Sequence, residues 1–400
     1  MITVDEALNL LTEHISPLEA ERIGIQDALY RVAAEQMAAG IELPPFAQSA
    51  MDGYAVRAGD LADASQDRPV TLEVVGEVAA GESGALPTVE LNQTVRVFTG
   101  GRIPPGADAV VRQECVGRDE GRAIFVDPVD AGRDIRRVGE ELHTDRVLVE
   151  EGERVDERHI AALSMTGHAE LLVRCRPRIT LLVSGDEVVA PGNELQAGQV
   201  YDANLPFLAG WLQARGYESF EILRLPDDRE VVQRGLDEAL GASDLVVSTG
   251  GVSVGDYDFF GEATDDLGLE KVFWKVRQKP GKPLLFARRA ETPFLGLPGN
   301  PGAVFVAAYI YLRRALDLLE GARPAGPAMQ TGVLAAPIGL SKRRLNFAGC
   351  ALDFDAQGRA MLSALGSHRL GTLYRADAIA RIPEGDGELP AGTAVQWLPL

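Results

Sequence analysis

The sequence predicts a multidomain protein that combines α/β and β architecture. Its 400 residues exceed what one hydrophobic core usually organises, so we expect two to four domains. Strand and helix patterns alternate from residue 175 to about residue 322, which is typical of a mostly parallel sheet with helices on both faces. Residues 41–139 and the last segment of the chain instead carry short strand patterns and turn signals. These observations predict a three-layer α/β/α domain and two smaller β-rich regions.

The amino-terminal 40 residues carry helix patterns. Apolar positions recur at helical spacing in DEALNLL and in IQDALYRVAAEQMAA, and acidic residues occupy the first turn. A basic region followed by an apolar run is missing, so we expect no signal peptide. A second helix pattern, ERHIAALSMTG, ends at Gly167. We expect it to pack on the first helices, which makes the β-rich region between them an insertion.

The β-rich region contains two loops with candidate functional residues. In LPPFAQSAMDGYAVR, Pro44 and Pro45 favour an extended entry, and Gly53 is expected to permit a turn beside Asp52. In RVFTGGRIPPGADAVV, Thr99 precedes a double glycine at the end of a strand pattern. Loops of this kind often carry binding or catalysis, but their composition assigns no reaction.

Three glycine-rich loops follow strands of the α/β segment. They are SGDE (184–187), STGG (248–251) and LPGNP (297–301). In an open parallel sheet, ligands bind beyond the carboxyl ends of the strands, and glycine lets backbone N–H groups approach an anion. We therefore expect a phosphate-bearing ligand, although STGG alone is equally consistent with a tight turn. The loop is not a Walker A motif, because Asp256 follows Gly255 where that motif has lysine.

Acidic and basic residues accompany these loops. Carboxylates beside a phosphate site favour Mg²⁺ between them, and solvated surface acids are the alternative. Asp227 and Asp228 are also placed to cap the helix that starts at DREVV. The segment KVRQKPGKP presents four cations on a chain stiffened by prolines, which predicts an anion site rather than an ordinary basic loop. The acids in question are Asp186, Glu187, Asp202, Asp227, Asp228, Asp256 and Asp258, and the cations are Lys275, Arg277, Lys279 and Lys282.

Composition excludes several classes of function. The net charge of −20 argues against nucleic acid or an anionic membrane as a partner. The five histidines show no metal-ligand spacing, which makes a zinc site improbable, and no G-x-S-x-G elbow occurs. No run of about 18 apolar residues is present. We therefore expect a soluble, cytoplasmic protein.

The motifs taken together resemble the molybdopterin molybdenumtransferase family, which includes the bacterial MoeA proteins and the E domains of gephyrin and plant Cnx. The matching pieces are PPFAQSAMDGYAV, FTGGRIPPGADAVV, GRDIRRVGEE, SGDEVV, GQVYDAN, STGGVSVGDYDF, FWKVRQKPGKP and GLPGNP. They occur in order from residue 43 to residue 301, and with the flanking regions the likeness covers nearly the whole chain. MDGYAV, GGVSVGD and KPGKP are highly specific in combination.

The resemblance implies an architecture and a reaction. It implies a homodimer with a helical dimerisation domain (1–42 and 140–172), an inserted β domain (43–139), an α/β molybdopterin-binding domain (173–322) and a carboxyl-terminal β-barrel (323–400). It implies an enzyme that inserts molybdate into adenylylated molybdopterin, with Mg²⁺-dependent cleavage of the pyrophosphate and release of AMP. The implied protein partners are the molybdopterin adenylyltransferase and chaperones specific to molybdoenzymes.

The resemblance also carries over site residues by motif position. Glu187 and Asp258 are expected to bind the metal, and Asp52 and Thr99 to act from the partner subunit. The residues expected in catalysis are Asp52, Thr99, Arg136, Glu187, Asp228 (or its neighbour Asp227), Asp258, Lys275 and Lys279. Those expected to bind the substrate are Ser184, Gly185, Asp186, Ser248, Gly250, Gly251, Ser253, Lys282, Pro298, Asn300, Pro301, Arg344 and Ser367.

Three positions depart from the family pattern and keep alternatives open. Glu141 stands where the family often has aspartate, Ala303 where it has serine, and Gly349 where it has a second arginine. These departures bear on the molybdate pocket, so a tungstate-inserting paralogue and a non-catalytic molybdopterin-binding scaffold remain alternatives. Adenylyltransferases and nucleotide pyrophosphatases with a related α/β domain are a third alternative, but they lack the MDGYAV region.

Overall fold

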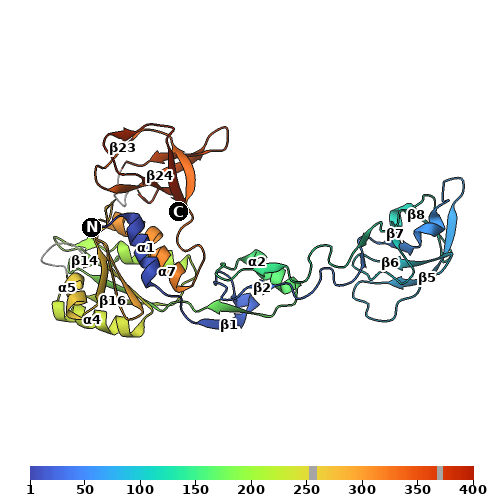
Figure 1. Cartoon of the computed structure of the whole chain (residues 1–400), viewed down its shortest axis with the longest axis horizontal. Helices are drawn as coiled ribbons and strands as arrows, with labels where there is room; N and C mark the ends of the chain where they lie inside the picture. The colour runs from blue at the N-terminus through green and yellow to red at the C-terminus, as the bar shows by residue number, and fades with distance from the viewer. Residues whose placement is uncertain (252–258, 367–372) are drawn as a thin grey trace. The chain divides into compact units, whose positions relative to one another are not determined.

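The computed structural model describes residues 1–251, 259–366 and 373–400. The chain separates into two compact units (Figure 1). The first unit comprises Met1–Glu35, Glu151–Asp156 and Leu171–Leu400, and the second comprises Gln36–Glu150 and Glu157–Glu170. The division into the four domain ranges implied by the resemblance stays a prediction.

The first unit is built on a six-stranded sheet of order β16-β13-β17-β21-β20-β18. The first four strands run parallel, whereas β20 is antiparallel to β21 and β18 is antiparallel to β20. The strands are β13 (Ile179–Ser184), β16 (Phe220–Leu225), β17 (Leu245–Thr249), β18 (Glu270–Trp274), β20 (Leu285–Arg289) and β21 (Thr292–Leu297). The short pair β14 (Val188–Val189) and β15 (Val200–Tyr201) lies in the connection after β13.

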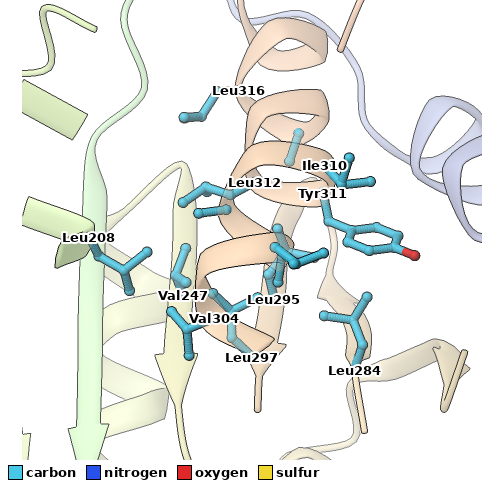
Figure 2. Close-up of a cluster of buried hydrophobic side chains, with 14 of the residues drawn as sticks. Leu208, Val247, Leu284, Leu295, Leu297, Val304, Ile310, Tyr311, Leu312 and Leu316 are labelled. Carbon is cyan, nitrogen blue, oxygen red and sulfur yellow. The ribbon is translucent and has the colours of Figure 1, made fainter. Parts of the chain in front are cut away.

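Helices cover both faces of this sheet, because successive residues of its central strands are apolar on both sides. Leu245 and Val247 belong to one hydrophobic cluster and Val246 to the other. Figure 2 shows Val247, Leu295 and Leu297 on the strands next to residues of the covering helix. One face carries α4 (Arg229–Ala242) and α5 (Phe259–Asp266). The other carries α1 (Val4–His14), α3 (Asn204–Gln213), and the successive segments α6 (Pro301–Ala307), η4 (Ala308–Leu312, a π-helical turn) and α7 (Arg313–Leu319).

The carboxyl-terminal region forms a closed barrel of five strands. The barrel closes because β22 pairs with both β25 and β28, and β24 and β26 complete the ring. These strands are β22 (Gln330–Leu334), β24 (Leu345–Phe354), β25 (Ala360–Ala364), β26 (Ala378–Ile382) and β28 (Ala394–Pro399), with a small pair β23 (Ile338–Gly339) and β27 (Glu388–Leu389) beside them. The predicted multidomain α/β fold with a carboxyl-terminal β-barrel is confirmed.

The first of the two amino-terminal helix patterns forms a helix, and the second does not. A capping box formed by Thr3 and Glu6 starts α1, which ends at His14. The predicted helix over IQDALYRVAAEQMAA is wrong, because Tyr30 has a left-handed backbone (φ 62°) and the N–H groups of Tyr30 and Ala33 donate to Val155 and Glu153. Pairing with distant strands therefore replaced helical hydrogen bonds. The elements found here are β1 (Ala20–Gly24), which pairs with β12 (Glu170–Arg174), and η1 (Ile25–Asp27).

The second unit contains a six-stranded sheet of order β7-β4-β6-β5-β9-β8. Its strands are β4 (Gly53–Val56), β5 (Val70–Val78), β6 (Gln93–Val97), β7 (Ala109–Arg112), β8 (Val116–Asp119) and β9 (Arg122–Phe125), with short turns η2 (Ala58–Leu61) and η3 (Gln113–Cys115). Two-stranded pairs join β3 (Gln48–Ser49) to β10 (Ile135–Arg136) and β2 (Met37–Ala38) to β11 (Val147–Val149). The predicted second helix is α2 (Glu157–Met165). Its packing on α1 stays a prediction, since α1 belongs to the other unit.

Within the described ranges, no helix has the length and apolar character required to cross a membrane. The aligned register of the parallel strands places Val183 opposite Thr249 and Thr249 opposite Leu297, so three strands of the first unit end at one edge of the sheet.

Candidate functional site

The glycine-rich loops of the first unit meet at this edge. A Cβ added to Gly250 would lie 3.3 Å from the carbonyl oxygen of Ser184, and one added to Gly299 would lie 3.5 Å from the Cα of Gly250. Gly250 and Gly251 both have positive φ, and a Cβ on Gly251 would lie 2.8 Å from the ring of Phe260. The close approach and the left-handed backbone therefore both require glycine in STGG. The structure brings together the loops that begin at residues 184, 248 and 297.

Two serine hydroxyls lie just below these loops. Ser184 is 8% exposed and Ser248 is fully buried. Residues two apart share a face of a strand, so Ser184 and Ser248 lie with Leu182 and Val246 on the α4/α5 side of the sheet. In the described part of the chain, the Oγ of Ser248 has no hydrogen-bond partner. A buried hydroxyl without a partner is available to donate a hydrogen bond. Ser253 lies outside the described residues.

The acidic residues of the site divide into two groups. The backbone N–H of Asp186 donates to Asp227 Oδ2 and that of Asp227 donates to Asp186 Oδ1, both at 3.3 Å. Burial raises the pKa of Asp227, and the negative charges of Asp186 and Glu187 raise it further. Asp228 instead caps α4, since its Oδ1 accepts a hydrogen bond from the N–H of Val231 at 3.0 Å. The carboxylate that faces the other acids is therefore Asp227, although the expected catalytic residue is Asp228.

Asp202 is buried and is used structurally. Its Oδ2 lies 2.8 Å from Nη2 of Arg224, and its Oδ1 accepts from the N–H of Leu205 at the start of α3. Asn300 similarly caps α6, accepting from the N–H of Gly302, and Pro301 is the first residue of that helix. Both capped starts hold the loops around them in place, because the orphan N–H groups of a helix end are satisfied locally.

The basic segment 275–282 lies against the third glycine-rich loop. A Cβ on Gly281 would lie 3.5 Å from Cβ of Ala303 and 3.6 Å from Cγ of Pro298. Lys275 has a left-handed backbone (φ 69°), and its ammonium group sits 3.5 Å from the centre of the Trp274 ring. A left-handed backbone is strained for any residue other than glycine, so the surrounding structure must maintain it. Such residues are common at functional sites. The segment thus presents its cations beside the strand-end loops.

The barrel contributes to the same region. The strand β19 (Gln278–Lys279) pairs in parallel with the first residues of β24, and the N–H of Leu345 donates to the carbonyl of Arg277. Arg344 is half-buried, and Oδ1 of its near neighbour Asn346 is buried without a hydrogen-bond partner in the described residues. Ser367 lies outside the described residues. The pairing places Arg344 next to the basic segment.

The candidate residues of the second unit surround the short strand β3. Asp52 Oδ1 accepts from both the N–H and the Oγ1 of Thr99, each at 2.8 Å, and these bonds hold the pKa of Asp52 below its ordinary value. Gly100 donates its N–H to the carbonyl of Ser49 on β3. On the other side of β3, Arg136 pairs with Glu141 at 2.6 Å. The structure therefore brings Asp52 and Thr99 into direct contact and places Arg136 on the neighbouring strand.

Gly53 has a different role from the expected turn. It lies within β4, and a Cβ there would lie 2.2 Å from the carbonyl oxygen of Val111 on the next strand. The position requires glycine because the two backbones approach closely, and its φ is not in the left-handed region. The turn expected at Gly53 is wrong.

A metal site is only partly described. Asp258, one of the two expected ligands, lies outside the described residues. Glu187 is exposed next to Asp186. Across residues 1–251, 259–366 and 373–400, no group of three or more histidine, cysteine or acidic side chains has the geometry of a metal cage.

Sequence reasoning overlooked two buried polar residues, one within the basic segment and one that binds it. Gln278 is fully buried and donates from Nε2 to the carbonyl of Gly281 at 3.0 Å, while its Oε1 accepts from the hydroxyl of Tyr311 in η4. The sequence signal that could have identified Gln278 is its uncharged amide side chain within a segment of cations. The partner of this amide could not be found from the sequence, because Tyr311 follows 33 residues later within an apolar run.

Comparison with known proteins covers the whole chain. Residues 2–167 match the family model described as the MoeA N-terminal region (domain I and II), residues 181–317 match a probable molybdopterin binding domain, and residues 331–400 match the MoeA C-terminal region (domain IV). The chain is 32% identical to a molybdopterin molybdenumtransferase of Haemophilus influenzae, over 100% of this chain and 99% of the relative. It is 33% identical to molybdopterin molybdenumtransferase 2 of Mycobacterium tuberculosis, over 99% of each chain.

A solved structure supports the same relationship. The molybdopterin biosynthesis MoeA protein from Pyrococcus horikoshii superposes with a TM-score of 0.83 at 28% identity, covering 100% of this chain and 99% of that one.

Proposed function

The chain belongs to the MoeA family of molybdopterin molybdenumtransferases, and we propose that it acts on adenylylated molybdopterin and releases AMP. It is an enzyme of molybdenum cofactor biosynthesis with molybdopterin and molybdate as substrates. The observation that carries the proposal is the meeting of three glycine-rich strand ends with a cationic segment at one edge of the sheet. A pyrophosphate-bearing substrate needs such a set of donors, because its charge is spread over several oxygens.

The strand-end loops bind the phosphates in this proposal. The backbone N–H groups of Gly250 and Gly251 and the free hydroxyl of Ser248 are the donors. Contacts described above also place Ser184, Gly185, Pro298, Asn300 and Pro301 at the edge of this site. The capping of α4 by Asp228 keeps the loop of Asp227 in place, so we assign the expected active carboxylate to Asp227 instead.

The cationic segment stabilises the negative charge that develops during the reaction. Hydrolysis forms a bond from a water oxygen to one phosphorus and breaks that phosphorus's bond to the bridging oxygen, which leaves as part of the other phosphate, and the proton of the water passes to solvent. Negative charge on the leaving oxygen rises as the bridging bond breaks. Lys275, Lys279 and Lys282 are fixed near the loops before the reaction, so they lower the energy of this charge without reorganising. Arg344 adds a further cation from the barrel.

The side chains of the site are of the type that binds magnesium. Asp186, Glu187 and Asp227 concentrate negative charge, and carboxylate oxygens are the ligands that Mg²⁺ prefers. Burial raises the pKa of Asp227, and the charges of Asp186 and Glu187 raise it further. A bound Mg²⁺ would neutralise phosphate charge and polarise the bond to the leaving oxygen. We propose Glu187 as its ligand within the described residues, and Asp258 as a second one beyond them.

We propose a homodimer in which Asp52, Thr99 and Arg136 complete the site of the partner subunit. This proposal is supported by the two hydrogen bonds from Thr99, which hold the pKa of Asp52 low and fix its carboxylate beside the end of β6. The same proposal includes a cytoplasmic location. It also includes receipt of the substrate from the adenylyltransferase and delivery of the product to molybdoenzyme chaperones.

The three departures from the family pattern are accommodated by local contacts. Glu141 reaches Arg136 at 2.6 Å. Ala303 packs near Gly281, so a small side chain suits the close approach of the basic segment. A Cβ on Gly349 would lie 2.4 Å from Leu373, so the barrel leaves no space for arginine there. We therefore retain the transferase reaction for this chain.

The proposal is tested by AMP release from adenylylated molybdopterin by the purified protein with Mg²⁺, in the presence of molybdate, of tungstate or of neither. The expected result is oxyanion-dependent release of AMP. A K279Q/K282Q variant should lose about 10²-fold or more in kcat/KM, whereas the exposed Lys342→Gln on the barrel should retain activity. Tight binding of the pterin without AMP release would instead support the scaffold alternative, and release only with tungstate would support the paralogue.

A further inference from the structure

The cationic turn Lys279–Lys282 needs an internal restraint. Within the described residues, no carboxylate lies within ion-pair distance of Lys275, Lys279 or Lys282. Like charges within a few residues of one another repel, which favours an open turn. The restraint must therefore come from uncharged contacts beneath the turn.

Gln278 provides two such contacts. Its side chain is fully buried, and its Nε2 donates to the carbonyl of Gly281 at 3.0 Å, which ties the turn to the residue that precedes it. Its Oε1 accepts from the hydroxyl of Tyr311. The backbone closes the same turn, since the N–H of Val276 donates to the carbonyl of Lys282. Gln278 thus links the cationic turn to the helix that follows the third glycine-rich loop.

Tyr311 reaches this position from the π-helical turn η4. Figure 2 shows its ring extending from the helix on the side of Leu284, with the hydroxyl directed away from the helix. π-helical turns are rare and occur often at functional sites. Burial strongly raises the pKa of Tyr311, so its hydroxyl stays a donor throughout the working pH range. The helix that carries Tyr311 begins at Pro301, within the substrate-binding loops.

We infer that Gln278 and Tyr311 are positioning residues, whose hydrogen bond holds the cationic turn at the distance from the glycine-rich loops that the anionic substrate requires. The inference rests on the proposed function. The mechanism is indirect: neither side chain contacts the substrate, and both act through Lys279 and Lys282.

The test uses the full-length protein and two readouts. Tyr311→Phe removes only the hydroxyl. We expect a rise of about tenfold in the KM for adenylylated molybdopterin, which corresponds to about 1.4 kcal/mol, with a smaller change in kcat. Amide hydrogen exchange of residues 276–284 should become faster. The matched control is Tyr309→Phe, two residues earlier on the same turn, whose ring packs on Phe305 and Trp211. It should leave both readouts unchanged.

A double variant separates positioning from stability. Gln278→Met combined with Tyr311→Phe removes the buried acceptor together with its donor, so the Tm should recover relative to Tyr311→Phe alone. The KM should stay raised, because the turn is still not held. Recovery of both values, or unchanged exchange in Tyr311→Phe, would overturn the inference. If the wild-type protein releases no AMP, the proposed function fails, and the exchange readout alone decides whether the hydroxyl holds the turn.

Discussion

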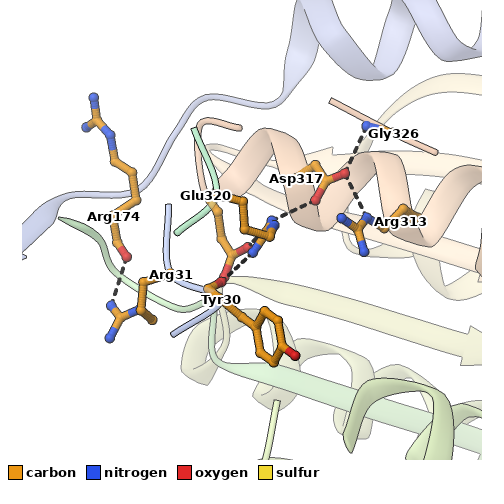
Figure 3. Close-up of polar contacts among 8 residues, drawn as sticks. Tyr30, Arg31, Arg174, Arg313, Asp317, Glu320 and Gly326 are labelled. Carbon is orange, nitrogen blue, oxygen red and sulfur yellow. Dashed lines mark hydrogen bonds and ion pairs between the residues drawn. The ribbon is translucent and has the colours of Figure 1, made fainter. Parts of the chain in front are cut away.

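Removing the charge of Arg154 should strongly destabilise the protein. Arg154 Nη2 lies 2.8 Å from Asp317 Oδ1 and 2.7 Å from Glu320 Oε2, and the side chains of the two acids are 3% and 2% exposed. Figure 3 shows that Asp317 also accepts from Arg313 and from the N–H of Gly326, whereas Glu320 lacks these two partners. The Arg154→Met variant therefore leaves the buried carboxylate of Glu320 without the cation that pairs with it.

The expected loss of unfolding free energy follows from this geometry. Breaking one side of a buried ion pair costs about 3–5 kcal/mol, because the remaining charge stays away from water. At about 2–4 °C per kcal/mol, the Tm should fall by roughly 6–20 °C. The assay is thermal unfolding followed by calorimetry at neutral pH. Adding Glu320→Gln to Arg154→Met should recover part of the loss, since the orphaned group is then neutral.

The control is Arg323→Met. Arg323 is 73% exposed on its side chain and lies 3.7 Å from Glu151, so it should cost less than about 1 kcal/mol. A Tm for Arg154→Met within about 2 °C of the wild type would refute the reasoning, because it would mean that the two acids do not depend on this cation.

Three further predictions concern other parts of the chain. Thr99→Val removes one bond to Asp52, so the pKa of Asp52 should rise toward its ordinary value and the acid limb of the pH–activity profile should move to higher pH; an unmoved limb would contradict this. Burial raises the pKa of Asp244, but hydrogen bonds from Arg178 outweigh burial and hold that pKa below its ordinary value. The Arg178–Asp244 pair therefore stabilises the folded protein at pH values above the unfolded-state pKa of Asp244, and this stabilisation is lost as the pH falls through the folded-state pKa. Arg178→Gln should therefore lower the Tm most at neutral pH and least below about pH 4, whereas a pH-independent difference would exclude the ion pair as its cause. Gly53→Ala should destabilise by about 1–3 kcal/mol or more in chemical denaturation, because its Cβ would collide with a backbone carbonyl that cannot rotate away, and a neutral effect would contradict the close approach.

Matched controls exist for these three variants. Thr144→Val removes a similar bond, to Glu42, elsewhere in the second unit. Arg229→Gln breaks a pair with Asp266, whose side chain is 30% exposed against 22% for Asp244, so its effect on the pH dependence of the Tm should be smaller. Gly59→Ala adds a Cβ where nothing lies within 4 Å.

The chemistry of the candidate site was largely predictable from short motifs. Glycine in STGG, acids after the strands and lysines between prolines each state a local requirement, because φ angles, hydrogen-bond donors and charge belong to single residues. The choice between Asp227 and Asp228 was not predictable. Both carboxylates precede the helix, and only the direction of each side chain decides which one caps it.

The sequence by itself determined the alternation of strands and helices, the position of the glycine-rich loops at strand ends, and the membership of the family. Periodic burial and turn chemistry act over a few residues, so they can be read directly. The tertiary structure alone decided that residues 30–39 pair with distant strands and that Tyr311 binds Gln278. Both depend on partners far along the chain, because backbone and buried polar groups take whichever partner the packed fold brings to them.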